Sequence, residues 1–196
     1  MKQEKFEYDT FFHVYNRGNN KEDIFKEDKN YSYFLKLVRQ HLLDVAEIYA
    51  YCLLKNHFHI VLRIKDRNEI PDKYVDKIHV PFSNLFNAYS KAINKAYNRT
   101  GSLFQEHLKR NKIKDENYLI NLILYVHLNP VKHKFYDDFR EYKHSSFLSY
   151  ISDKPSSLHR DYILDLFGGK SNFIYQHKEI KIRYEDVINE IDNFDD

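Results

Sequence analysis

Two histidines separated by a single residue, His57 and His59, are the side chains in this sequence best suited to chemistry. They open an apolar, β-rich run that extends to Ile64, and alternate side chains of a strand leave the same face. Both imidazoles would therefore project together, at a spacing suited to sharing one metal ion. Two ligands do not complete a metal site, and a His-x-His pair on a strand is more often structural or solvated.

A second candidate group is predicted on a helix that begins after Asp115 and ends near Asn129 and Pro130. Tyr125 and Asn129 are four residues apart, so they project from one face, with Tyr118 on roughly the same stripe. A tyrosine hydroxyl has a pKa of about 10, but a cation that polarises a phosphate makes its attack on a phosphodiester feasible. If this helix packs beside the histidine strand, the Asn129 amide oxygen can be a third metal ligand. By default, Tyr125 would be a core residue and Asn129 a residue of the helix end.

Alternating strands and helices are expected around these residues. The strand and helix patterns follow the order β-α-β-β-α-β, and a further helix comes after them. This order predicts an α+β, ferredoxin-like split βαβ fold, with an antiparallel sheet and helices on one face. The expected strands are 10–15, 47–53, 57–64 and an extended stretch at 102–113, and the expected helices are 31–43, 80–98 and the one after Asp115.

The last quarter of the chain has a different character. Short helical patterns at 158–167 and 184–191 are separated by a glycine pair, Gly168 and Gly169, which indicates a hinge or a turn. We therefore expect a first domain at residues 1–150 that carries the chemistry, followed by a helical C-terminal extension at 151–196 that is acidic at its end.

Composition limits the kinds of protein this chain can be. With 196 residues, 42% of them hydrophobic and 31% charged, the chain suits one compact domain. No apolar run approaches the roughly 20 residues that cross a bilayer, and the N-terminus lacks the apolar core of a signal peptide. We expect no membrane association and a cytoplasmic location. The single cysteine, Cys52, excludes an internal disulfide and a thiolate-rich zinc site, so any metal would be held by imidazole, oxygen and water.

Charge is unevenly distributed although the formal net charge is only +2. Residues 104–134 hold six lysines and arginines against three acids, whereas residues 171–196 hold three against seven. A basic middle region favours a polyanion partner, and the 17 tyrosines and 15 phenylalanines can supply stacking platforms for unpaired bases. The basic run is equally well read as a solvated face, and most of the aromatic side chains are expected in the core.

Four ordered motifs carry a resemblance to a known family. They lie at residues 13–20 (HVYNRGNN), 51–59 (YCLLKNHFH), 101–105 (GSLFQ) and 125–131 (YVHLNPV). Over roughly residues 8–150, the chain resembles the single-tyrosine HUH transposases, and within them the REP-associated tyrosine transposases.

That resemblance implies a mechanism. His57 and His59 would bind a divalent metal, Mg²⁺ or Mn²⁺, Asn129 would be the third ligand, and Tyr125 would attack single-stranded DNA. A covalent 5′-phosphotyrosine and a free 3′-OH would result, and the strand could be rejoined without a nucleotide cofactor. The partner would be single-stranded or hairpin DNA, and the protein would act as a monomer or a homodimer.

DNA contacts are expected from a second set of residues, which are basic except for one aromatic side chain proposed to stack on bases. They are Arg17, Phe104, Lys109, Arg110, Lys112, Lys114 and Lys132. The alternative function is a catalytically inactive or domesticated nucleic-acid-binding module of the same fold. A zinc hydrolase is disfavoured because no His-Glu-x-x-His spacing occurs.

Overall fold

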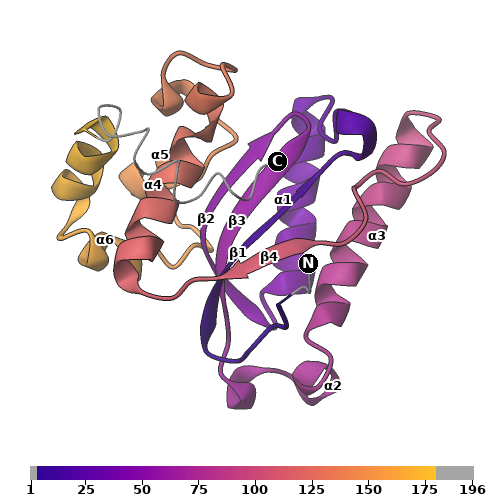
Figure 1. Ribbon diagram of the computed structural model, residues 1–196, viewed down its shortest axis with the longest axis horizontal. Helices are drawn as coiled ribbons and strands as arrows, with labels where there is room; N and C mark the ends of the chain where they lie inside the picture. Colours follow the sequence, from indigo (N-terminus) through magenta and orange to yellow (C-terminus); the bar gives the residue numbers. More distant parts are fainter. Residues whose placement is uncertain (1–3, 180–196) are drawn as a thin grey trace.

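A four-stranded antiparallel sheet forms the centre of the protein (Figure 1). The structure, a computed structural model, describes residues 4–179. The strands lie in the order β2-β3-β1-β4, so β3 and β1 are central. Together with the helices between the strands, this order confirms the predicted split βαβ fold. The strands are β1 (Thr10–Arg17), β2 (Ala46–Leu54), β3 (His57–Ile64) and β4 (Lys109–Lys112).

Two long helices, α1 (Asp28–Leu42) and α3 (His79–Ala96), cover one face of the sheet (Figure 1). Both were predicted from their apolar periodicity. Their buried side chains, such as Phe34 and Leu85, share one core with Phe58 and Ile60 of β3. The shorter elements around them are α2 (Asp72–Val75) and the 3-10 turns η1 (Asn19–Lys21), η2 (Arg67–Glu69) and η3 (Phe139–Glu141).

The opposite face of the sheet is covered by α4 (Glu116–Lys132), with α5 (Phe147–Ile151) and α6 (Arg160–Leu166) packed around it (Figure 1). Residues 170–179 are helical as well. Side chains from this region, including Ile163 and Phe173, share a second core with α4 and β2. Because helices cover both faces, seven of the eight residues of β3 are buried. The histidine strand therefore lies in the interior of the protein.

The start of α4 follows the prediction, and its end lies slightly beyond the predicted one. The Asp115 carboxylate caps the helix by accepting a hydrogen bond of 2.8 Å from the backbone N–H of Tyr118. The helix then runs through Pro130 to Lys132, just beyond the predicted end near Asn129 and Pro130. Proline has a helix-compatible φ, and it costs one backbone hydrogen bond and a clash with the preceding turn. Asn129 and Pro130 are buried, so tertiary packing holds this part of the helix in place.

Other boundaries differ in smaller ways. Only four residues of the predicted extended stretch at 102–113 pair as β4, with an additional bridge between Gly18 and Phe104. The glycine pair forms the predicted turn, with φ of 76° at Gly168 and 105° at Gly169. The helix predicted at 184–191 and most of the acidic tail lie outside the described residues. None of the described helices is long and apolar enough to span a bilayer.

Candidate functional site

The two histidines of β3 point toward α4. His59 is opposite Tyr15 of β1 and Cys52 of β2, and the two histidine rings are 5.2 Å apart between centroids. His57 Nδ1 is 2.7 Å from Oδ1 of Asn56. Because an amide oxygen only accepts hydrogen bonds, Nδ1 of His57 carries the hydrogen and Nε2 keeps a lone pair. His57 therefore has its lone pair on Nε2, the nitrogen that faces away from Asn56.

The turn before β3 is held by the loop that follows β1. The carbonyl of Asn56 accepts a hydrogen bond of 2.7 Å from Gly18, and the carbonyl of Lys55 accepts bonds from Ile24 and Phe25. A Cβ on Gly18 would lie 2.0 Å from the Glu22 carbonyl oxygen, so only glycine fits there. The motif at residues 13–20 thus supports the turn that orients His57.

Helix α4 brings Tyr125 against the histidine strand, which is the condition that the candidate site requires. The Tyr125 ring meets the His59 ring edge to face, with centroids 5.7 Å apart. One further side chain reaches the phenol, because Nζ of Lys132 lies 3.2 Å from the Tyr125 hydroxyl and 4.8 Å from the ring centroid. The spacing of seven residues places both on one face of the helix. Lys132, predicted as a DNA contact, therefore lies at the candidate nucleophile.

Asn129 is fully buried one helical turn after Tyr125. Its Nδ2 donates to the Tyr125 carbonyl at 3.3 Å. Its Oδ1 is buried and has no hydrogen-bond partner among the described residues. Such an unsatisfied acceptor costs about 1–3 kcal/mol, so a buried amide oxygen in this position calls for a partner. A cation would supply one.

The donor set suits a hard or borderline divalent ion. No group of three His, Cys, Asp or Glu side chains within residues 4–179 has the arrangement of a metal site. Cys52 is next to His59 across the sheet, and burial raises the pKa of its thiol well above the ordinary value, so the thiol is protonated in the metal-free protein at neutral pH. Two imidazoles and an amide oxygen remain, which leaves positions for water or substrate oxygens.

Two more histidines adjoin this group and had no predicted role. His13 Nε2 is 2.9 Å from His59 Nδ1, and the ring of His133 lies 4.7 Å from that of His57. Strand β1 places His13, Tyr15 and Arg17 at alternate positions, so all three share the face of the paired histidines. The alternation of these residues is visible in the sequence, but only the pairing of β1 with β3 shows that they lie beside the paired histidines.

Strand geometry divides the basic run between two faces. Lys109 pairs with Tyr15 and its Nζ lies 5.7 Å from the Tyr15 ring centroid, on the face of the histidines. Its neighbour Arg110 points to the other face, over the Phe6 ring at 4.4 Å. Lys112 lies on that face too and pairs with Glu7 at 2.5 Å. Because neighbouring strand residues alternate, Lys109 lies on one face of β4 and Arg110 and Lys112 lie on the other.

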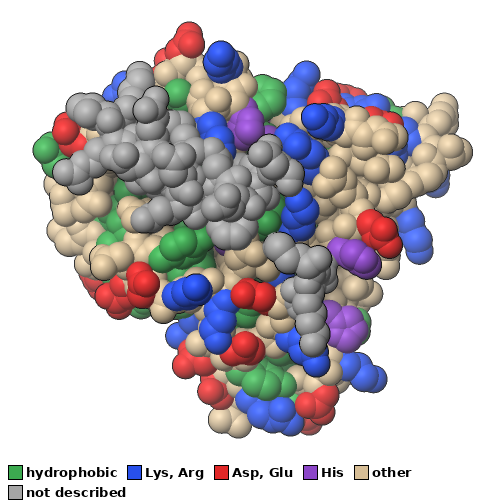
Figure 2. Space-filling model, in the orientation of Figure 1, with side chains coloured by type: hydrophobic (Ala, Val, Ile, Leu, Met, Phe, Trp, Pro, Cys, Tyr) green, Lys and Arg blue, Asp and Glu red, His purple; other side chains and the backbone are tan. Residues whose placement is uncertain are grey.

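The remaining DNA-contact candidates differ in exposure. Phe104 is buried and its ring contacts those of Phe58 and Phe86, so it belongs to the core and offers no free face to a base. Lys114 is exposed, and Arg17 is half-buried opposite His57. On the face shown in Figure 2, basic and acidic side chains are interspersed.

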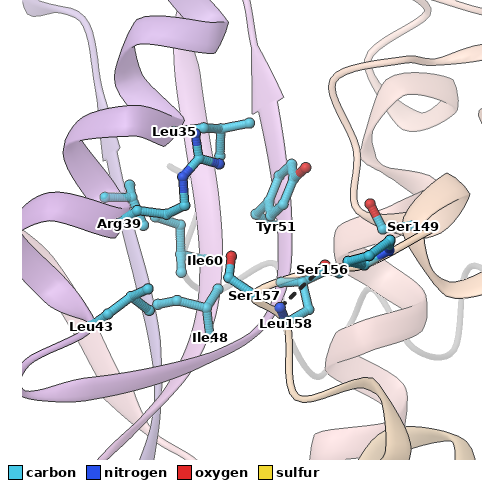
Figure 3. Close-up of a pocket in the computed structure, with 12 residues that line it drawn as sticks. Leu35, Arg39, Leu43, Ile48, Tyr51, Ile60, Ser149, Ser156, Ser157 and Leu158 are labelled. Atoms are coloured by element: carbon cyan, nitrogen blue, oxygen red, sulfur yellow. Dashed lines mark hydrogen bonds between the residues drawn. The ribbon is translucent and has the colours of Figure 1, made fainter.

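An apolar pocket of about 550 Å³ lies away from this site, between α1, β2 and residues 155–158 (Figure 3). Leu35, Ile48 and Ile60 form part of its wall, and Arg39 is its only charged lining residue. None of the predicted site residues lines it. With no carboxylate or imidazole, this pocket lacks the groups for phosphodiester chemistry, so the cluster between β3 and α4 is the better candidate site.

Comparison with known proteins agrees with the resemblance found in the sequence. A solved structure of a REP-associated tyrosine transposase bound to a REP hairpin has the same fold, with a TM-score of 0.59 and 16% identity; the alignment covers 79% of this chain and 89% of that one. A curated Haemophilus influenzae (strain Rd) protein named as a REP-associated tyrosine transposase is 24% identical over 104 residues. The resemblance to REP-associated tyrosine transposases is confirmed.

The sequence match to the Haemophilus transposase is partial. It spans 52% of this chain and 58% of that transposase. No family model matches the chain. At 16% identity, the solved transposase shows only the fold that this chain adopts. The side chains of the site are the evidence for an activity.

Proposed function

We propose that this protein is a metal-dependent DNA transposase or single-strand endonuclease, which cleaves and rejoins hairpin-flanked single-stranded DNA through a covalent 5′-phosphotyrosine. One observation carries the proposal: the Tyr125 ring packs on His59, and the unsatisfied Oδ1 of Asn129 lies one helical turn away on α4. A nucleophile and three oxygen or nitrogen donors thus come from two elements far apart in the sequence. The fold shared with a hairpin-bound transposase supports a DNA substrate.

In this proposal the Tyr125 hydroxyl oxygen attacks a backbone phosphorus. A bond forms between that oxygen and phosphorus, the bond from phosphorus to the 3′ oxygen breaks, and the 3′ oxygen leaves with a proton as a free 3′-OH. A 3′-OH attacking the phosphotyrosine reverses these bond changes, so rejoining needs no nucleotide cofactor. The charge of Lys132 beside the phenol stabilises the phenolate that forms when the proton departs.

His57, His59 and Asn129 are the residues that would hold a divalent ion. When bound, Mg²⁺ or Mn²⁺ would polarise the scissile phosphate. The protein's part is to fix the donors, through Asn56 for His57 and through the Tyr125 carbonyl for the amide of Asn129. One contact is to a side-chain amide and the other to a backbone carbonyl, and both orient the lone pairs before substrate binds.

The burial of Tyr125 favours a second candidate function, a nucleic-acid-binding module without catalytic activity. The Tyr125 side chain is only 1% exposed, so a DNA strand reaches the hydroxyl only if binding opens the site. A nucleic-acid-binding module that keeps this cluster for stability would show the same burial. The two functions differ in whether a covalent bond to DNA forms.

A single assay separates them. Labelled single-stranded hairpin DNA is incubated with the protein and Mn²⁺ or Mg²⁺, with and without a chelator, and run on a denaturing gel. We expect a denaturant-stable complex that the chelator or His57→Ala abolishes. His159→Ala removes a histidine outside the site and should leave the complex unchanged. Binding to the hairpin with no covalent complex would support the binding module.

A further inference from the structure

The Nδ1 atoms of both paired histidines have a close neighbour. For His57 it is the amide oxygen of Asn56 at 2.7 Å, and for His59 it is Nε2 of His13 at 2.9 Å. The first contact has one possible direction, because an amide oxygen cannot donate. The second joins two imidazoles, and either ring can be the donor. The direction of that bond decides what the other nitrogen of His59 can do.

Only one direction suits metal binding. If His13 donates, His59 Nδ1 is the acceptor, and a neutral His59 then carries its hydrogen on Nε2 and has no lone pair there. If His59 donates, Nε2 keeps its lone pair, as Nε2 of His57 does. Both histidines can then bind the same ion through equivalent nitrogens.

We propose that His13 is a positioning residue, which accepts a hydrogen bond from Nδ1–H of His59 and so holds the His59 tautomer that binds metal through Nε2. This inference rests on the metal site of the proposed function and adds a residue to it. His13 would act on the ion only through His59, as partners of metal-bound histidines commonly do.

The surroundings of His13 hold its ring in place. It is 1% exposed, lies in central strand β1, and stacks on Tyr15 with centroids 4.8 Å apart and on His59 at 5.1 Å. Its backbone partners across the sheet are Val61 of β3 and Asn111 of β4. A buried imidazole costs free energy unless it is hydrogen-bonded. The bond to His59 gives the imidazole a function.

The first test reads the tautomer directly in the metal-free protein. Long-range ¹H–¹⁵N spectra of the histidine side chains distinguish Nδ1–H from Nε2–H. We expect Nδ1–H at His59 in the wild type, loss of that preference in His13→Phe, and its return in His13→Gln, whose amide oxygen can accept. Nε2–H at His59 in the wild type, or no change in His13→Phe, would overturn the proposal.

The second test measures Mn²⁺ affinity without DNA, by titration followed with electron paramagnetic resonance. We expect His13→Phe to weaken binding by about 10–100-fold, the usual effect of losing such a partner, and His13→Gln to recover most of it. Tyr15→Phe, which keeps the ring stacked on His13, is the matched control and should bind as the wild type does. Equal affinities in His13→Phe and the wild type contradict the positioning role.

Neither readout depends on DNA cleavage. A wild type that binds Mn²⁺ and shows the expected tautomer but forms no covalent complex would refute the proposed function and leave the role of His13 intact. A wild type that cleaves DNA while His13→Phe matches it in tautomer and affinity would refute the role of His13 alone.

Discussion

At the scale of single residues, Lys132 is the side chain whose role the structure changes most. Its Nζ is 3.2 Å from the Tyr125 hydroxyl, where it can stabilise a phenolate. Hydrogen bonds to charged groups contribute about 1.5–3 kcal/mol, so Lys132→Met should slow strand cleavage by roughly 10–100-fold in single-turnover assays. Exposed Lys36, on α1 and outside the site, offers the matched control, Lys36→Met, whose cleavage rate should be unchanged. If Lys132→Met weakens DNA binding but leaves the rate alone, Lys132 contacts phosphate instead.

The unsatisfied oxygen of Asn129 gives a second prediction at this scale. In the metal-free protein, Asn129→Leu removes a buried polar group and should change the free energy of unfolding by less than about 1.5 kcal/mol. In the wild type, Mn²⁺ at about 100 times its dissociation constant should add about 2.7 kcal/mol of stability, and Asn129→Leu should lose most of that gain. Thermal unfolding with and without Mn²⁺ measures both effects. A full Mn²⁺ stabilisation in Asn129→Leu would exclude Asn129 as a ligand.

The sequence predicted the members of this site better than their environment. Spacing alone put His57 and His59 on one strand face and Tyr125 and Asn129 on one helix face. That the two faces meet depends on which side of the sheet α4 covers, and local periodicity does not encode that. The same holds for His13, whose contact with His59 joins residues 46 positions apart.

At the scale of elements, the loop after β1 determines where the histidine strand begins. Gly18 is in close contact with the Glu22 carbonyl and bonds to Asn56, so Gly18→Ala must shift backbone. We expect a loss of about 1–3 kcal/mol in the free energy of unfolding and weaker Mn²⁺ binding. Gly101→Ala is the control: it has open space around it and a φ of 82°, so it should cost about 1 kcal/mol and leave Mn²⁺ binding unchanged. A Gly18→Ala variant with wild-type stability would show that this contact relaxes freely.

The end of α4 and the two faces of β4 are features that the local sequence pattern does not predict. Helix α4 begins at its Asp115 cap, as predicted, yet continues through Pro130 because Asn129 and Pro130 are buried. In β4, the lysines and arginine appear as one basic run in sequence, but the period of two sends Lys109 and Arg110 to opposite faces. A charge count over a window of sequence does not separate the two faces of a strand.

At the scale of the whole molecule, a buried hydrogen-bond chain joins residues 170–179 to the rest. His177 Nδ1 donates to the Phe173 carbonyl at 2.7 Å and its Nε2 is 2.8 Å from Nδ1 of His127, whose Nε2 is 2.7 Å from the Ser146 hydroxyl. Burial lowers the pKa of His177 to about 4, and burial also lowers the pKa of His127 well below its ordinary value. Both imidazoles are therefore neutral in the folded protein at neutral pH.

The hydrogen-bond chain through His177 and His127 predicts that the folded protein loses stability in acid. The unfolded state takes up protons at these histidines near pH 6.5, while folded His177 does so only near pH 4. The stabilisation is complete above pH 6.5 and falls as the pH drops toward 4, by up to about 3 kcal/mol for His177. Urea unfolding at pH 7, 5.5 and 4.5 measures this, and His177→Phe should show a shallower dependence. An identical dependence in His177→Phe would contradict the assignment.

The overall architecture was the most predictable level. The β-α-β-β-α-β order follows from alternating periodicities that each cover a whole element, so errors of a few residues at the ends do not change it. The second layer on the far side of the sheet, where α4, α5 and α6 share a core, follows from no local pattern. It buries β3 on both faces and makes the site an interior one.

The central claim is that Tyr125 forms the covalent bond to DNA, and the most direct measurement is the mass of the DNA-modified peptide. The wild type is incubated with single-stranded hairpin DNA and Mn²⁺, digested with protease and nuclease, and sequenced by tandem mass spectrometry. We predict a phosphonucleotide on Tyr125, its absence in Tyr125→Phe, and its persistence in Tyr118→Phe. A phosphonucleotide on Tyr118, or none on any tyrosine while the DNA is cut, would contradict the account.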